Sequence, residues 1–208
     1  MLFAKIKQHY EAVVAVCCFL ILFTNVGLPS TSFSVYQPYL VDLPGVGHSG
    51  GSIIVSVRTF VSLLAMLVVG RYYDLVDCRI GAFLATLSVS AGFALYSLAG
   101  SNFGMLCGAS ALTGLGYGFG GMIASTMLIN RWFRVNVATV AGVAAVGSGV
   151  AAIVIPNAAV ALISAFDLQT AFRAEAALAL VIGVTVFALL RNDPRDMGLT
   201  PTREARRR

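Results

Sequence analysis

Gly70–Gly81, GRYYDLVDCRIG, is a short charged stretch between two long apolar runs. It carries two arginines and two aspartates in a region that otherwise has almost no charge. The runs on either side, Ser52–Val69 and Ala82–Ala99, are about as long as the roughly 20 residues that a helix needs to cross a bilayer. The charged stretch is therefore expected to lie in water as a loop, and it fixes the direction of both helices.

The composition extends this pattern to the whole chain of 208 residues. Hydrophobic residues make up 58% and charged residues only 11%, whereas a soluble domain is about 25% charged. A charged side chain at the membrane centre costs roughly 2.5–3.5 kcal/mol, which explains why the charges gather in short blocks between apolar runs. The composition nearly excludes a water-soluble fold and predicts an all-α membrane protein.

Six apolar runs are predicted to span the membrane. The first should run from residue 12 past a kink at Pro29 to about residue 39, and the others should cover about 52–72, 80–99, 103–129, 137–164 and 171–190. A Gly- and Pro-rich outer loop is expected over Asp42–Gly51, and Pro156 is expected to break the fifth span. The chain thus divides into an amino-terminal segment (1–11), a transmembrane domain (12–190) and a basic tail (191–208).

The basic residues are distributed unevenly. All lysines and arginines except Arg58 and Arg173 fall on the side of the two chain ends. By the positive-inside rule, both ends are expected to be cytoplasmic, in a multi-pass protein of the inner or plasma membrane. The net charge of +5 therefore reflects topology. It does not predict nucleic-acid binding, because the basic residues are not interleaved with aromatic residues on one polar face.

The loops of this chain resemble those of the amino-terminal half of a major facilitator superfamily transporter. That family's loop between spans two and three reads G-x-x-x-D-R-x-G-R-R; Gly70, Asp74 and Arg79 match it, and Leu75, Asp77 and Cys78 depart from it. Two further segments resemble oxalate/formate-antiporter-like and monocarboxylate-porter-like members. They are the start of span five, with Arg131–Trp132–Phe133, Ala138 and Gly142, and the end of span six, with Asp193–Pro194, Gly198–Leu199 and Pro201.

The resemblance implies one half of a twelve-helix fold, built from two inverted three-helix repeats. In such a fold, spans one, two, four and five should face a central cavity, and spans three and six should face lipid. Asp74 would help to close the cytoplasmic side, together with Arg79, Arg131 or Arg71 and a helix of the other half. Gly70, Asp74, Arg79 and Arg131 are therefore the candidate gating residues.

Arg58 is the strongest candidate for substrate binding. It lies inside span two, in the outer half of the membrane, and an intramembrane arginine is a functional candidate by default. Its guanidinium offers two parallel donors to a carboxylate. The alternative is a structural role, in which Arg58 extends to the outer headgroups or pairs with Asp42 or Glu175.

Further polar residues within the spans are candidates for lining a cavity. Asn25, Tyr36 and Gln37 belong to the first span, Tyr117 to the fourth and Asn157 to the fifth; packing or a place at the outer mouth is the alternative for each. Glu175 and Arg173, at the start of span six, are expected to have a structural role. No acidic residue is expected deep in a span as a proton carrier, which favours exchange or uniport over proton symport within this half.

The remaining patterns indicate packing rather than chemistry. Span four has small-xxx-small pairs, Gly114 with Gly118 and Gly116 with Gly120, which are typical of closely packed membrane helices. The four cysteines show no metal-ligand spacing. Neither a cofactor nor a metal is expected, and no arrangement of residues suggests an enzyme.

The sequence therefore predicts a secondary active transporter of a small organic anion, either a monocarboxylate or a dicarboxylate, that works by alternating access. Its expected partners are the lipid bilayer, the anion, and a second six-helix half or a second copy of the chain. The alternative is a truncated, non-transporting six-helix membrane protein or fragment.

Overall fold

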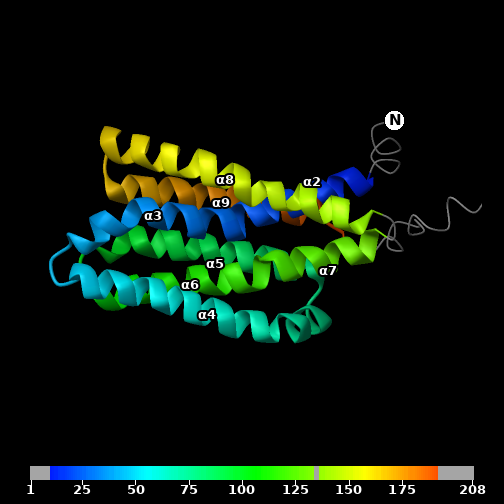
Figure 1. Cartoon of the computed structure of the whole chain (residues 1–208), viewed down its shortest axis with the longest axis horizontal. Helices are drawn as coiled ribbons and strands as arrows, with labels where there is room; N and C mark the ends of the chain where they lie inside the picture. The colour runs from blue at the N-terminus through cyan, green and yellow to red at the C-terminus, as the bar shows by residue number, and fades with distance from the viewer. Residues whose placement is uncertain (1–9, 134–135, 192–208) are drawn as a thin grey trace, which may run out of the picture.

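The computed structural model describes residues 10–133 and 136–191. In these ranges the chain forms helices that lie side by side in an elongated bundle (Figure 1). They are α2 (Tyr10–Leu22), the π-helical turn η1 (Phe23–Gly27), α3 (Leu28–Val41), α4 (Gly47–Leu75), α5 (Cys78–Ala99), α6 (Phe103–Gly120), α7 (Met122–Trp132), α8 (Val137–Ala165) and α9 (Leu168–Leu189).

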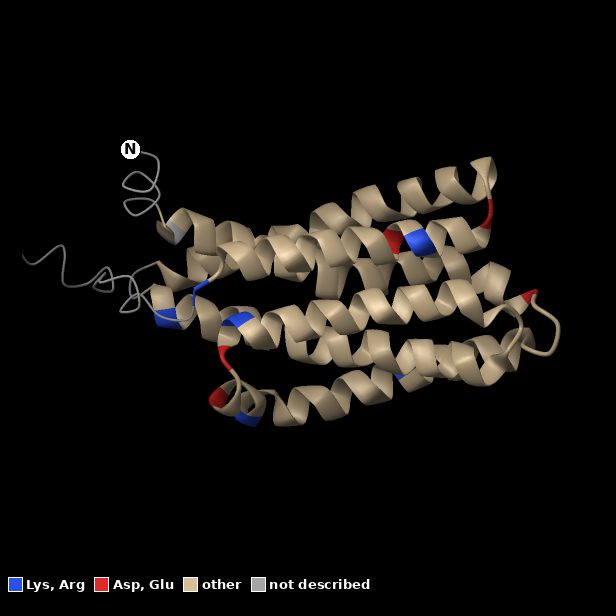
Figure 2. Cartoon of the chain, turned by 180° about the vertical axis from the view of Figure 1, so that it is seen from behind, with Lys and Arg blue, Asp and Glu red and all other residues tan. Residues whose placement is uncertain are grey.

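Within the described ranges, six helical segments are long and apolar enough to cross a membrane, which confirms the predicted plan. Two of them are interrupted: Ala12–Val41 contains α2, η1 and α3, and Phe103–Trp132 contains α6 and α7. The other four correspond to α4, α5, α8 and α9. Most of the basic residues in the described ranges lie at the end of the bundle where the described chain begins (Figure 2). Their position relative to the cytoplasm stays a prediction.

The predicted loop over Gly70–Gly81 is far shorter than expected. Helix α4 continues to Leu75 and α5 begins at Cys78, so only Val76 and Asp77 are non-helical. Two tyrosines at the end of α4 explain the difference, because their rings pack into the bundle. Tyr73 is buried and donates its hydroxyl to the Phe119 carbonyl at 2.8 Å. Tyr72 donates to the Gly81 carbonyl at 3.2 Å.

The outer loop is also shorter than predicted, because α4 already begins at Gly47. The chain reverses over residues 42–46, where Gly45 has a φ of 84° and Gly47 a φ of 61°. Glycine adopts this left-handed region without the steric cost that a Cβ would add. The tight reversal therefore adds helical residues to the start of span two.

The helix irregularities differ from those predicted at the prolines. The first span changes to a π-helix over Phe23–Gly27, which ends two residues before Pro29, and Pro29 lies in the first turn of α3. Helix α8 contains Pro156 but runs without a break to Ala165, so the predicted break was wrong. The loss of one backbone hydrogen bond did not end a helix of 29 residues. Span four breaks instead at Gly121, whose backbone is extended.

Two apolar clusters of described residues fill the bundle, one toward each end. We call the end that contains the cluster of Tyr10, Trp132 and Leu190 the terminal half, because the described chain begins and ends there. We call the opposite end, with the cluster of Tyr36, Phe93 and Phe172, the loop half. The π-helical turn η1 lies between α2, which contributes to the first cluster, and α3, which contributes to the second.

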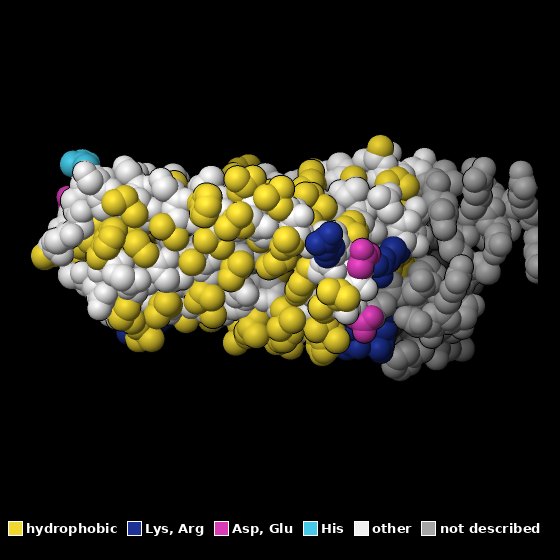
Figure 3. Space-filling view, turned by 90° about the horizontal axis from the view of Figure 1, so that it is seen from below, with side chains coloured by type: hydrophobic (Ala, Val, Ile, Leu, Met, Phe, Trp, Pro, Cys, Tyr) yellow, Lys and Arg dark blue, Asp and Glu magenta, His cyan; other side chains and the backbone are white. Residues whose placement is uncertain are grey.

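The six spans are buried to different extents. Helix α5 packs against both α6 and α9, and 56% of its apolar stretch is buried. This differs from the expectation that span three mainly faces lipid. The corresponding shares are only 17% for α4 and 22% for α8. The face of the bundle that includes α4 is apolar over most of its length, with charged side chains gathered at one end (Figure 3).

Candidate functional site

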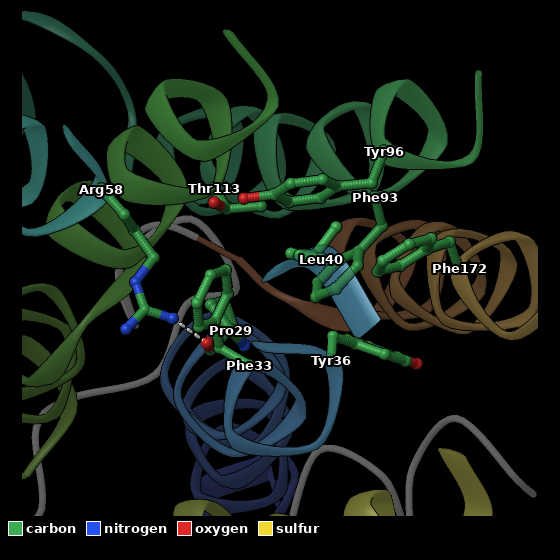
Figure 4. A pocket seen from close by; sticks show the side chains of 9 residues that line it. All are labelled: Pro29, Phe33, Tyr36, Leu40, Arg58, Phe93, Tyr96, Thr113 and Phe172. Atoms are coloured by element: carbon green, nitrogen blue, oxygen red, sulfur yellow. Dashed lines mark hydrogen bonds between the residues drawn. The ribbon is translucent and has the colours of Figure 1, made fainter. Parts of the chain in front are cut away.

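A pocket opens in the loop half between α3, α4, α5, α6 and α9. Its free space is small, about 10 Å³, which is room for roughly one water molecule. Most of its walls are aromatic rings, and one side chain is basic (Figure 4). The lining residues are Pro29, Phe33, Tyr36, Leu40, Arg58, Phe93, Tyr96, Thr113 and Phe172.

The aromatic residues form one packed group. The ring of Phe172 stacks on Tyr96 at 5.3 Å between centroids and contacts Tyr36 at 4.4 Å. Phe93 lies 6.2 Å from Tyr96 and 6.5 Å from Phe172. Such offset and tilted contacts are favourable beyond simple area burial. They join α3, α5 and α9 into one wall of the pocket.

Arg58 supplies the positive charge at one side of this pocket. Its Nη1 donates a hydrogen bond to the carbonyl of Pro29, and its guanidinium lies over the Phe33 ring, 5.1 Å from the centroid (Figure 4). Among the described residues, no carboxylate forms an ion pair with it. The predicted pairing with Asp42 or Glu175 is thus not seen, and the side chain is half-buried in the bundle.

Glycine residues of α6 determine how close α4 comes at this point. A Cβ added to Gly114 would lie 2.5 Å from the carbonyl oxygen of Arg58, and one added to Gly118 would lie 2.4 Å from the Cβ of Ala65. Gly116 makes an equally close approach to α5, at 2.6 Å from the Ala85 carbonyl oxygen. These contacts confirm that the glycines of span four are packing residues, and Gly114 sets the position of the Arg58 backbone.

Glu175 is the main site feature that the sequence reasoning missed. Its side chain is only 5% exposed, about two turns into α9. Oε1 accepts hydrogen bonds from the Ser32 hydroxyl at 2.9 Å and the Tyr36 hydroxyl at 2.8 Å. Oε2 is buried without a hydrogen-bond partner among the described residues. The prediction that no acidic residue lies deep in a span was therefore wrong.

The spacing of residues in α9 contained the signal for this burial. The buried face of α9 repeats every three to four residues through Phe172, Glu175, Ala179 and Ile182. Residues at this spacing share one face of a helix. Reading the helical phase, rather than the distance from the start of the span, would have placed Glu175 in the core.

Tyr36 connects the buried acid to the pocket. Its ring forms part of the pocket wall, while its hydroxyl points away from the pocket (Figure 4). That hydroxyl donates to Glu175. A single side chain of α3 thus separates the carboxyl group from the space beside Arg58.

The other predicted cavity residues lie elsewhere. Asn25 is fully buried and donates to the Ile21 carbonyl at 3.1 Å and to the Thr86 hydroxyl at 3.0 Å. Asn157 is exposed on α8 and donates to the Ile153 carbonyl at 2.6 Å. Of the six candidates, the pocket brings together Arg58 and Tyr36, and those outside its lining are Asn25, Gln37, Tyr117 and Asn157.

The candidate gating residues lie at the terminal end. Arg79 donates from Nε to the Phe187 carbonyl at 2.6 Å and lies 4.1 Å above the Phe187 ring. Arg131 donates to the Tyr73 carbonyl at 3.4 Å. Asp74 is exposed and forms no ion pair with any described basic residue. Gly70 has no neighbour within 4 Å of an added Cβ, so no close approach there requires glycine.

The described residues contain no group of three or more histidine, cysteine or acidic side chains that could hold a metal ion. Cys17, Cys18 and Cys78 are buried, with free thiols. The arrangement can instead attract an anion at Arg58 and surround an apolar group with aromatic rings.

Comparison with known proteins gives one match that covers most of the chain. A search of curated proteins found no match. The family model described as Major Facilitator Superfamily matches residues 14–208.

Proposed function

Because this chain belongs to the major facilitator superfamily of membrane transporters, we propose that it takes part in the secondary active transport of a small organic anion. The anion would bind in the pocket beside Arg58, and access to that pocket would alternate between the two sides of the membrane. The chemistry of the lining suits a monocarboxylate with an apolar body, and the pocket would widen to admit it as access alternates.

The observation that carries this proposal is a single basic side chain in an aromatic pocket. Arg58 forms one hydrogen bond to a neutral carbonyl, that of Pro29, and has no carboxylate partner among the described residues. A guanidinium has five N–H donors, so it can still take a carboxylate in a two-pronged contact. Away from bulk water, the attraction between the two charges is stronger.

The rest of the lining favours one carboxylate over two. Apart from Arg58, the pocket is formed mainly by aromatic and aliphatic side chains, and these suit the apolar part of a ligand. A second carboxylate would enter this space without a cation to pair with. We therefore expect monocarboxylates to bind more tightly than dicarboxylates of similar size.

Alternating access needs a second unit that moves against this bundle, and the exposed faces of α4 and α8 support its position. These helices carry large apolar side chains that the bundle leaves open, including Phe60 (62% exposed), Leu67 (74%) and Ile153 (70%). Transporters of this class bind substrate between two halves related by symmetry. We propose that a second six-helix unit packs against α4 and α8, with Asp74 and its neighbouring arginines at the cytoplasmic edge of that contact.

The direct test is ligand binding and uptake by the purified chain, with Arg58→Gln as the test variant. Binding is measured as the rise in melting temperature with increasing lactate, benzoate or oxalate, because a ligand that binds the folded state stabilises it. Uptake of labelled benzoate and lactate is measured in proteoliposomes. We expect Arg58→Gln to weaken monocarboxylate binding by roughly 10–100-fold, as expected for the loss of a charged hydrogen-bonding partner.

Arg173→Gln is the matched control, because Arg173 is also in the loop half but is exposed and bonds only to Gln169 among the residues described. Equal binding by wild type, Arg58→Gln and Arg173→Gln would contradict the role of Arg58. Anion binding without uptake would support the binding site and indicate that the chain does not transport by itself.

A further inference from the structure

The buried carboxyl group of Glu175 has no role in the anion site described above. It is separated from the pocket by the Tyr36 ring, and it is only 5% exposed. An ionised carboxylate without a partner is very costly to bury, whereas a neutral carboxyl group with hydrogen bonds costs much less. An ionised Glu175 would therefore need a positively charged group close to it.

No helix packed against α9 supplies that charge near Glu175. Helices α3 and α8 contain no charged residue. The only charged residue of α5 is Arg79, which bonds to Phe187 at the opposite end of α9. The titratable groups that face this region are the hydroxyl groups of Tyr36, on Glu175 itself, and Tyr96, which is paired with Ser110.

Charged groups further from the site do not compensate Glu175 either. Arg58, across the pocket on α4, bonds to Pro29. On α9 itself, Arg173 is exposed and bonds to Gln169, and Asp167 lies at the exposed start of the helix. Helix α2 also contacts α9, but it packs in the terminal half, and its only charged residue, at position 11, is at its beginning.

The two carboxyl oxygens of Glu175 are used unequally. Both hydroxyl donors, from Ser32 and Tyr36, meet at Oε1, while Oε2 has no hydrogen-bond partner in the described part of the chain. A proton from water can therefore form an O–H bond at Oε2 without displacing either donor, and the group then loses its negative charge. A sodium ion would need several more oxygen ligands than this site provides.

Helix α3 links this acid to the anion site. On one side, Ser32 and Tyr36 bond to Glu175. On another, Pro29 and Phe33 contact Arg58. Each pair is four residues apart and so shares a helix face. Helix α3 begins directly after η1, and π-helical turns are frequent at functional sites.

We propose that Glu175 is a proton-binding site and that its protonation is coupled, through α3, to the binding of an anion at Arg58. Gaining a proton removes the charge that holds the hydroxyl groups of Ser32 and Tyr36. The hydrogen bonds that hold α3 against α9 then weaken, and the positions of Pro29 and Phe33 beside Arg58 change. The coupling rests on the proposed anion site, but the proton site does not.

The proton site is tested by infrared difference spectroscopy of the purified full chain between high and low pH. The signal is the C=O stretching band of a protonated carboxyl group. We expect this band in wild type and in Asp167→Asn, and its loss in Glu175→Gln. Glutamine keeps an acceptor for Ser32 and Tyr36, so the fold should persist, which is checked by circular dichroism and gel filtration.

Tyr36→Phe provides a second spectroscopic test that leaves the carboxyl group in place. Removing one hydrogen bond to the carbonyl oxygen should move the band to higher frequency. An unchanged band in Glu175→Gln would overturn the proton site, as would a band in wild type that responds to sodium at constant pH and not to pH.

The coupling is tested by measuring benzoate binding at several pH values. In wild type, the affinity for benzoate should change roughly tenfold or more with pH, which is in the lower part of the usual range for coupled sites. In Glu175→Gln, the affinity should change less than about twofold over the same pH range. Equal pH dependence in both proteins would overturn the coupling. If no anion binds any variant, the proposed function and the coupling fail together, while the infrared result still decides the proton site.

Discussion

The terminal half and the loop half hold their polar side chains in different ways. In the terminal half, buried hydroxyl and indole groups donate to backbone carbonyls far away in the sequence, as Tyr10 does to Leu189, Tyr73 to Phe119 and Trp132 to Arg191. The loop half also has bonds to carbonyls, from Arg58 to Pro29 and from Ser90 to Ala176. It differs in that Ser32 and Tyr36 donate to another side chain, the carboxyl group of Glu175.

This difference suits the terminal half to a structural role and the loop half to ligand binding. A backbone carbonyl cannot lose its role as an acceptor, so the bonds of the terminal half persist while the helices stay folded. A carboxyl group can gain a proton and a side chain can change rotamer, so the bonds of the loop half can change without unfolding. The loop half also contains the pocket and Arg58. Substitutions in the terminal half should therefore alter stability, and those in the loop half should alter binding.

The largest expected effect is that of Trp132→Ala in the terminal half. Trp132 is 2% exposed, its ring lies 4.8 Å from that of Tyr10, and its Nε1 donates to the Arg191 carbonyl at 3.3 Å. Truncating such a residue costs about 3–5 kcal/mol. Thermal unfolding in detergent should show the loss, and Phe166→Ala, at a residue 72% exposed, should not. Equal melting temperatures for the two variants would show that the terminal half is no scaffold.

The next effect compares two close helix contacts, one in each half. Gly114→Val would press on the backbone of Arg58, and Gly147→Val would press on the backbone of Phe19, where an added Cβ lies 2.3 Å from the carbonyl oxygen. Each should cost about 1–3 kcal/mol of stability through overpacking. Gly114→Val should also weaken benzoate binding, because Arg58 moves.

Gly142→Val is the control for both glycine variants, since nothing lies within 4 Å of an added Cβ there. It should melt at the wild-type temperature. Benzoate affinity is compared in the folded fraction of each variant. If Gly147→Val weakens binding as much as Gly114→Val does, the two halves do not differ in function.

A smaller effect separates two buried tyrosine hydroxyl groups. Tyr73→Phe removes the bond to the Phe119 carbonyl and should cost about 1 kcal/mol. Tyr36→Phe removes a bond to Glu175 and should change how benzoate affinity depends on pH, which Tyr73→Phe should leave as in wild type. Thermal shifts at several pH values measure both quantities. The same pH dependence in all three proteins would argue against a special role for Tyr36.

The smallest effect concerns Asp167, an exposed acid on the same helix as Glu175. Hydrogen bonds from the side chain and the backbone N–H of Thr170 lower its pKa, and the N–H bond to Oδ1 measures 2.6 Å. A lowered pKa in the folded state means that the stabilisation is complete above the unfolded value of about 3.9 and is lost as pH falls further.

The melting temperature of Asp167→Asn, compared with wild type between about pH 6 and pH 3, measures this contribution. Asparagine still caps a helix, so the variant should be slightly less stable than wild type at the upper pH, with a difference that shrinks as pH falls. A difference that grows on acidification would contradict the assignment.

Much of the fold follows from hydropathy alone. The six spans could be predicted because a charged residue in lipid is costly and the apolar runs are long enough to cross. The packing role of Gly114 and Gly118 could also be predicted, because the six glycines within Gly108–Gly121 need close helix contacts to justify them. The span limits were less accurate, since Tyr72 and Tyr73 extend α4 by packing, which hydropathy does not measure.

The candidate site could be predicted only in part. Arg58 stands out because its charge is rare within a span. The distance of Glu175 from the start of span six predicts a place near the helix end, whereas its helical phase, shared with Phe172 and Ala179, predicts burial. Its partners Ser32 and Tyr36 lie 143 and 139 residues away in sequence, and no local pattern connects them. Gln37 adjoins Tyr36 but points outward, since neighbouring residues on a helix face different directions.

The π-helical turn η1 lets the first span absorb a change in chain length. A π-helical turn holds one more residue than an α-helical turn, so deleting one residue from Phe23–Gly27 could close η1 as an ordinary α-helix while α3 keeps its orientation relative to α2. Phe33 and Tyr36 would then stay in the pocket wall. A one-residue deletion within α3, between Leu28 and Phe33, would instead rotate the following residues by about 100°, and Ser34 and Gln37 would take the places of Phe33 and Tyr36.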